Sequence, residues 1–264
     1  MMLTNYLVNI NHMEDIETLK KVGITTFLFA LDEFSIGYEK TFSVNEINNV
    51  KEDKYVLINR LLDSSDVDAL KNTLGDLNVQ GFVFEDIGLI NILNDANIKG
   101  KKILFMNHFN SNYASINAWL KYVDSVIVSN ELTEKEYVDI LKLVNKPVVL
   151  QVFGYNEIMY SRRYLLSNFY KKFELNGDSF NTITDNVTHI KFHLVESKYG
   201  TVALSEHIYN GRRLLNKDNV LFYYLNTSFI KTEDTLKFLN GDDVLNSDEG
   251  FLDKPTIYKL RSDN

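Results

Sequence analysis

The sequence predicts one α/β domain, a (β/α)8 TIM-like barrel. Short apolar segments rich in β-branched and aromatic residues recur along the chain, segments of helical periodicity lie between them, and a length of 264 residues is normal for one such barrel. Segments that are apolar throughout are typical of parallel strands buried on both faces. The alternative is an open doubly wound sheet, but no Gly-rich phosphate motif follows the first segment, which favours closure.

Eight strands are expected, and the first seven start about one βα unit apart. They are YLVNI from Tyr6, TTFLFAL from Thr25, KYVLIN from Lys54, GFVFED from Gly81, KILFMN from Lys102, SVIVSN from Ser125, PVVLQVFG from Pro147 and NVLFYYLN from Asn219.

Three of the intervening helices have clear signals. The helix in 13–23 ends at Gly23, a typical C-cap residue. The helix in 64–77 starts with a Ser/Asp cap and carries leucines at helical spacing. The helix in 133–145 starts with Thr133, and acidic residues in its first turn suit the helix dipole.

The regular alternation ends after Phe153. Within 154–218 we expect a helix at Arg163–Phe173 and two strands, THIKFHLVES and YGTVALSE, joined around Ser197–Gly200. The sequence therefore predicts a single barrel domain over 1–264, with 154–218 as a helix-plus-hairpin subdomain inserted between strands 7 and 8, over the C-terminal mouth. The segment GFLDKPTIYKL, from Gly250, is expected to add a short strand.

Composition excludes several function classes. A formal net charge of −8 argues against tight non-specific binding of nucleic acid. The chain has no cysteine, which excludes disulfides, thiolate nucleophiles and iron–sulfur clusters held by cysteine. No secretory signal and no apolar run of membrane-spanning length is present, so we expect a cytoplasmic protein without a membrane partner.

A ring of polar residues follows the predicted strands, where barrel enzymes place their chemistry. This pattern predicts a pocket for a small polar ligand, although Asn and Asp also favour turns and caps. The ring comprises Asn9, Asn11, Asp32, Glu33, Asn59, Arg60, Glu85, Asp86, Asn107, His108, Asn130, Glu131 and Gln151.

The chemistry of this ring points to proton transfer. His108 is the best single acid/base candidate, and Glu85, Asp86 and Glu131 are further candidates. There is no HExxH motif. His189 and His193 lie four apart in a predicted strand with Glu196 nearby and could bind a metal, but a surface or hairpin role is favoured, so no metal site is predicted. Basic pairs among aromatic residues in the insertion suit phosphate contacts and base stacking, or form a solvated helix face, and Arg163 equally suits a small carboxylate. These pairs are Arg162 and Arg163, Lys171 and Lys172, and Arg212 and Arg213.

The segment GYNEIMYSRRYLLSNF resembles the signature of the collagenase-like peptidase family of unknown catalytic type, peptidase family U32. Weaker matches are DEFSIGYEKTFSVNEI, SNELTEKE with Glu131, and the asparagines Asn59 and Asn112. ESKYGTVALS and GFLDKPTIYKL are similar to a short, cysteine-free Firmicute branch. The signature positions are Gly154, Tyr160, Ser161, Arg163, Leu165, Leu166 and Ser167.

Two departures from the family pattern stand out. Many relatives carry cysteines at the positions of Glu157 and Tyr164, and some ligate an iron–sulfur cluster with them, which this chain cannot do. The arginine that the family carries after the second strand is also missing, with Gly37 or Tyr38 in its place.

The resemblance implies one of three functions. The first is hydroxylation of the tRNA wobble uridine with a small organic acid such as prephenate. The second is proteolysis of collagen-like substrates, and the third is a non-catalytic role beside a larger family paralogue. For the first, Arg60 and Arg163 would hold carboxylates, His108, Glu131 and Glu85 would transfer protons, and the basic pairs would contact tRNA. Asn59, Asn112, Gln151 and Ser161 complete the expected substrate site.

Overall fold

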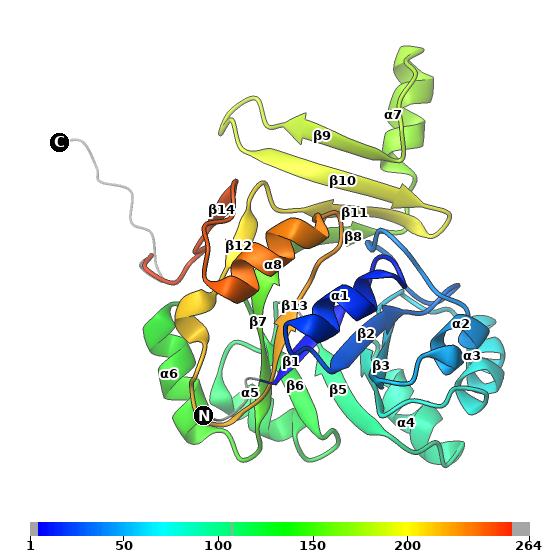
Figure 1. Cartoon of the computed structure of the whole chain (residues 1–264). Coiled ribbons are helices and arrows are strands. Elements are labelled where there is room, and N and C mark those ends of the chain that lie inside the picture. Colours follow the sequence, from blue (N-terminus) through cyan, green and yellow to red (C-terminus); the bar gives the residue numbers. More distant parts are fainter. Residues whose placement is uncertain (1–4, 107, 255–264) are drawn as a thin grey trace.

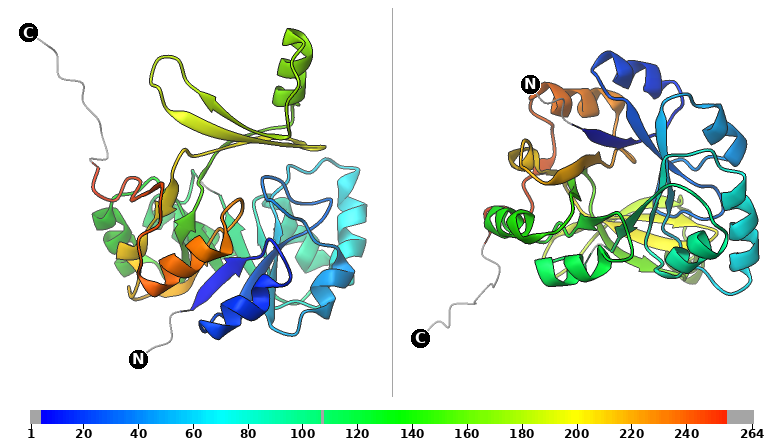
Figure 2. Two further views of the ribbon diagram at one scale, coloured as in Figure 1. Left: turned by 45° about the horizontal axis from the view of Figure 1, so that its top comes forward. Right: turned by 90° about the horizontal axis from the view of Figure 1, so that it is seen from below.

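Eight parallel strands close into a barrel in the computed structural model, which describes residues 5–106 and 108–254 (Figure 1). Neighbouring strands pair in chain order, and the last pairs with both the seventh and the first, so the ring closes (Figure 2). The predicted barrel and its eight strands are confirmed. The strands are β1 (Tyr6–Asn9), β2 (Thr26–Ala30), β3 (Asp53–Ile58), β4 (Gly81–Phe84), β5 (Lys101–Phe105), β6 (Ser125–Val128), β7 (Val148–Gly154) and β13 (Val220–Leu225).

Helices alternate with these strands and cover the outside of the barrel. Two of them begin with a complete capping box, Ser43 with Glu46 and Thr133 with Glu136. None of the helices in the described part of the chain is long and apolar enough to cross a bilayer. The helices are α1 (Asp15–Lys21), α2 (Val44–Asn49), α3 (Asp66–Gly75), α4 (Gly88–Asp95), α5 (Tyr113–Trp119), α6 (Glu134–Leu143) and α8 (Thr232–Asn240).

Successive residues of each strand belong to two apolar layers. In β2, Phe27 and Phe29 face the helices, whereas Leu28 and Ala30 fill the barrel interior. Burial on both faces explains why the strands are apolar without alternation. The interior layer ends near the mouth at Phe105 and Tyr224, whose rings meet edge to face.

The insertion after β7 is larger than a helix plus a hairpin. Its antiparallel sheet has the order β8-β11-β10-β9, and α7 (Leu165–Phe173) stands at one end of it (Figure 1). The predicted hairpin corresponds to β10 and β11, whereas β8 and β9 were not predicted because each is a short segment of mixed polar and apolar residues without the continuous apolar character of the barrel strands. The four strands are β8 (Glu157–Ser161), β9 (Phe180–Thr184), β10 (Lys191–Ser197) and β11 (Gly200–Leu204).

The chain returns from the insertion to the barrel through β12 (Ile208–Asn210) and a 3-10 turn, η1 (Arg212–Leu214). Strand β12 pairs with the end of β7 and with β14 (Ser247–Asp248). The strand expected from Gly250 is not present in its described part, since 250–254 forms turns, and the rest of that segment lies outside the described residues.

Gly154 marks the point where the chain leaves the barrel. Its φ is +114°, and a Cβ there would lie 2.0 Å from the carbonyl oxygen of Asn226, just after β13. A side chain at this position is therefore excluded both by the backbone conformation and by the close approach of the two strand ends.

We predict that Gly154→Ala lowers the free energy of unfolding by about 3 kcal/mol or more, because strain and a backbone clash combine. Gly23→Ala is the matched control: φ is +89° there, but nothing lies within 4 Å of its Cβ position. It should cost only about 1 kcal/mol. Urea denaturation of both variants checks this, and equal losses would contradict it.

Candidate functional site

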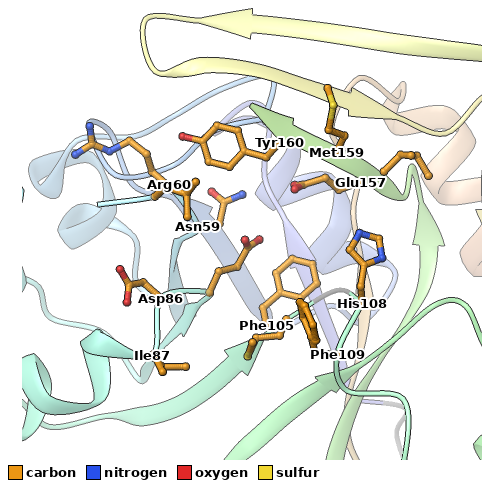
Figure 3. Close-up of a pocket in the computed structure, with 14 residues that line it drawn as sticks. Asn59, Arg60, Asp86, Ile87, Phe105, His108, Phe109, Glu157, Met159 and Tyr160 are labelled. Atoms are coloured by element: carbon orange, nitrogen blue, oxygen red, sulfur yellow. The ribbon is translucent and has the colours of Figure 1, made fainter. Parts of the chain in front are cut away.

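A cavity of about 530 Å³ lies at the barrel mouth between the ends of β3, β4 and β5 and strand β8 of the insertion (Figure 3). It brings together residues that are far apart in the sequence. Its wall combines apolar side chains with a few polar groups, as in small-molecule sites. It is lined by Asn59, Arg60, Leu61, Glu85, Asp86, Ile87, Phe105, Met106, His108, Phe109, Glu157, Ile158, Met159 and Tyr160.

Two carboxyl groups meet in this cavity, Glu85 from the barrel and Glu157 from the insertion. Burial raises the pKa of Glu157 to about 7. Burial also raises the pKa of Glu85 well above its usual range; the Glu157 charge adds to this rise, and a hydrogen bond from Asn59 opposes it. Near neutral pH the pair therefore retains a proton, so it offers both a donor and an acceptor to a ligand.

A half-buried tyrosine and a buried tyrosine bring their hydroxyls together near this carboxyl pair. The hydroxyls of Tyr38, from the loop after β2, and Tyr224, from β13, lie 3.0 Å apart. Burial raises the pKa of both phenols, and the charges of Glu157 and Glu85 raise the pKa of Tyr224 further. Both hydroxyls are therefore neutral groups that can donate hydrogen bonds at any physiological pH.

Asn59 holds the loop that carries Tyr38. Its amide accepts from the Ile36 nitrogen and donates to the Ile36 oxygen, each at 3.0 Å. The next residue, Gly37, has φ +80° and leaves its Cβ position only 3.2 Å from methyl groups of Val202 in β11. Asn59, predicted to bind substrate, lines the cavity but is engaged mainly in positioning this loop.

Arg60 lines the cavity and is held from two sides. Its Nη2 lies 2.6 Å from Asp66 Oδ1, and its guanidinium stacks 4.2 Å from the ring centroid of Tyr199, at the β10–β11 turn. Its Nε is buried and has no hydrogen-bond partner in the described structure. The ion pair neutralises part of the charge, but one donor is free for a ligand.

His108 and Glu131 form a pair at the rim. His108 Nδ1 lies 3.1 Å from Glu131 Oε1, and both side chains are about half exposed. His108 lines the cavity, whereas Glu131 lies behind it. The two predicted proton-transfer residues are thus brought together at the solvent side of the cavity. The neighbouring Asn107 lies outside the described residues.

Four predicted substrate residues lie outside the cavity lining: Arg163, which follows β8, and three whose polar groups have local partners. Asn112 caps α5 by accepting from the Ser115 nitrogen at 2.9 Å. Gln151 is buried and donates to the Tyr155 carbonyl at 3.3 Å. The hydroxyl of Ser161 accepts from the Arg163 nitrogen at 3.3 Å. For each of these three residues the polar group serves a local turn or cap.

The predicted RNA-binding residues do not form one surface, because η1 and α7 lie in different parts of the molecule (Figure 1). Arg212 donates to carbonyl groups at the end of α8, and Arg213 pairs with three acids. Arg162 lies 3.5 Å from Asp63. The cations left on α7 and just before it without an acidic partner in the described structure are Arg163, Lys171 and Lys172.

Glu157, Tyr38 and Tyr224 were not predicted as site residues. Glu157 and Tyr38 nevertheless carried a signal, since they occupy positions where the chain departs from the family pattern. Tyr164, the other departure, lies at the start of α7, outside the cavity, and donates to the Lys198 carbonyl. Among the residues that the structure describes, no group of three or more acidic or histidine side chains is suited to hold a metal ion.

The closed barrel with a polar cavity at its C-terminal mouth is an arrangement that many enzymes share. The family model described as peptidase family U32 matches residues 11–214, and the chain belongs to this family. No curated protein sequence matches the chain significantly.

Two solved structures share the general path of the chain. A chitinase from Chromobacterium violaceum is 9% identical, with a TM-score of 0.41, over 84% of this chain and 93% of its own. The C-terminal domain of a predicted chitinase from Desulfitobacterium hafniense is 11% identical, with a TM-score of 0.43, over 90% and 99%. A likeness at this level identifies no ligand.

We predict that the carboxyl pair makes stability depend on pH. The folded chain binds the proton of Glu157 more tightly than the unfolded chain, where the pKa is about 4.5. The contribution of this group is therefore fully present below pH 4.5 and is lost as the pH rises to about 7, by on the order of 1–3 kcal/mol.

Glu157→Gln should remove this loss and gain stability relative to wild type between pH 5 and 8. Glu46→Gln is a control of opposite sign, because the Ser43 backbone and hydroxyl lower the pKa of Glu46. Denaturation from pH 4 to 8 checks both variants. A Glu157→Gln curve parallel to that of wild type would contradict this, because it would show that folding does not raise the pKa of Glu157.

Proposed function

We propose that this family member takes part in hydroxylation of the tRNA wobble uridine, with the uracil ring entering the cavity at the barrel mouth. The observation that carries the proposal is that two residues lining the cavity, Arg60 and Glu85, each have a buried polar atom, Nε and Oε1, without a hydrogen-bond partner in the described structure. Such atoms are rare in folded proteins, and a polar ligand in the cavity would satisfy them once the two side chains turn toward it.

The cavity suits the edge of a uracil base. Uracil presents an imide N–H between two carbonyl oxygens, and two carboxyls that retain one proton offer both an acceptor and a donor to such an edge. Phe105 and Tyr160 line the cavity, and Phe109 at its rim is 67% exposed. Aromatic side chains in this position suit stacking on an unpaired base.

The proposed second ligand is a small organic acid such as prephenate, and Arg60 is the residue that would bind it. Its free Nε can donate to a carboxylate, although its pair with Asp66 weakens its charge. An anion also requires that Glu85 and Glu157 are not both ionised, which their raised pKa values favour. Arg163 lies outside the cavity lining, so this role rests on Arg60.

His108 and Glu131 complete the proposal. Their pair lies between cavity and solvent, where it can pass a proton between the bound ligand and water. Glu85 and Glu157 orient the base and exchange the proton at its edge. These side chains bind ligands and move protons, so the oxygen atom and the two-electron oxidation that hydroxylation requires must come from a co-substrate or a redox group supplied in addition to them.

The experiment is nucleoside mass spectrometry of tRNA from a deletion strain. We expect 5-hydroxyuridine-derived nucleosides to disappear and to return with the wild-type gene. Complementation with Glu157→Gln should restore about a hundredth of the wild-type level or less, as expected for loss of an acid/base group. Glu17→Gln, an exposed change on α1, is the control and should restore it fully. Unchanged tRNA in the deletion strain would contradict the proposal.

The non-catalytic role predicts a different result with purified components. Hydroxylation that appears only after a larger family paralogue is added, and that is insensitive to Glu157→Gln, would make this chain a supporting subunit.

Proteolysis is the second candidate, because aspartic proteases also use two neighbouring carboxyls of which one stays protonated, and the pKa values of Glu85 and Glu157 are both raised. We expect purified protein to leave gelatin and peptide libraries uncut from pH 4 to 8, with and without divalent metal. Cleavage that Glu157→Gln abolishes would instead assign the cavity to a peptidase.

A further inference from the structure

Helix α7 and the residues just before it are positively charged, although the chain as a whole is acidic. The stretch RRYLLSNFYKKF, 162–173, carries four cations and no acid, whereas the whole chain has a formal net charge of −8. Arg162 is paired with Asp63, and Arg163, Lys171 and Lys172 are exposed without an acidic partner in the described structure. The stretch is therefore a local attractor for anions on an acidic protein.

One side of α7 is fixed to the insertion sheet. Leu166 and Tyr170 pack against Leu194 and Ala203. The carboxylate of Glu196 accepts from the backbone nitrogens of Leu166 at 2.8 Å and Ser167 at 3.0 Å, which caps the first turn of the helix. The rest of α7 is thus presented to solvent on a firmly held helix.

Two phenylalanines on the adjoining side of α7 are exposed. Phe169 and Phe173 are 51% and 54% exposed, and their ring centroids lie 4.8 Å apart. Lys172 Nζ lies 5.4 Å from the centroid of the Phe173 ring. At 3.6 residues per turn, Lys172 lies about 60° around the helix from Phe169, whereas Lys171 lies about 160° away.

We propose that this face of α7, formed by Phe169, Lys172 and Phe173, binds a single-stranded segment of RNA. The rings would stack on bases, and Lys172 would contact a phosphate between them, which is the combination that single-stranded sites use. The inference rests on the proposed function: β8 lines the cavity with Tyr160 and leads through 161–164 into α7, so one RNA strand can reach both.

Other occupants fit the face less well. A lipid surface needs more apolar area than two phenylalanines on a nine-residue helix provide. A protein partner or a second copy would leave Lys172, the unpaired cation of the face, unexplained, unless the partner were itself strongly acidic. RNA accounts for the rings and the cations together.

The experiment is fluorescence anisotropy of a labelled, unmodified tRNA anticodon arm with the full-length protein. The Phe169→Ala/Phe173→Ala variant should bind about 20-fold more weakly or worse, as stacking contacts imply. Lys172→Ala should weaken binding several-fold and reduce the slope of log affinity against log salt by about 0.7. Lys171→Ala removes the same charge from the other side of the helix and should weaken binding less than twofold. Thermal melts should be alike, since all four side chains are exposed.

Three results would overturn the inference: equal effects of the two lysine changes, a double phenylalanine variant that binds like wild type, or a wild-type chain that binds anionic vesicles or itself through this face and not RNA. The outcome is separate from that of the proposed function. If the α7 variants weaken RNA binding but the deletion strain has unchanged tRNA, only the hydroxylation proposal is contradicted. If the deletion strain loses hydroxylation but the α7 variants bind RNA like wild type, only the RNA-binding role of α7 is contradicted.

Discussion

The pairing of β13 with both β1 and β7 is the constraint on which the rest of the structure depends. It closes the sheet and buries both faces of every strand. It also brings the end of β7 so close to Asn226 that only Gly154 fits there. From that glycine the chain turns across the mouth, and three residues later Glu157 starts the strand that forms one wall of the cavity.

Closure also decides the electrostatics of the cavity. Tyr224 is carried by β13 and meets Tyr38, which Asn59 holds in place through Ile36. The two carboxyls near these neutral hydroxyls are poorly solvated, and their ionised forms repel each other, so the pair keeps a proton at a pH where exposed carboxyls have lost theirs. The poor solvation of these carboxyls lowers the stability of the fold near neutral pH, and raised pKa values of this kind are common at active sites.

The fold could be predicted almost entirely from the sequence, because strands buried on both faces must be apolar and the helices between them carry caps and periodic leucines. Strands β8 and β9 could not, since they lie on an exposed sheet whose pairing partners, not their own sequence, define them. In the site, strand-end positions predicted Asn59, Arg60, Glu85 and His108 correctly as neighbours of one cavity. Glu157 could not be placed, because its neighbours are fixed only by how the insertion folds back.

The measurement that tests the account most directly is a ¹³C NMR titration of the glutamate side-chain carboxyls in wild type and Glu157→Gln. The account predicts a carboxyl resonance that titrates near pH 7 in wild type and is absent from the Glu157→Gln spectrum, while Glu85 shifts in the variant because its charged neighbour is gone. A wild-type spectrum in which every glutamate carboxyl titrates below about pH 5 would contradict the raised pKa of Glu157 and the cavity chemistry built on it.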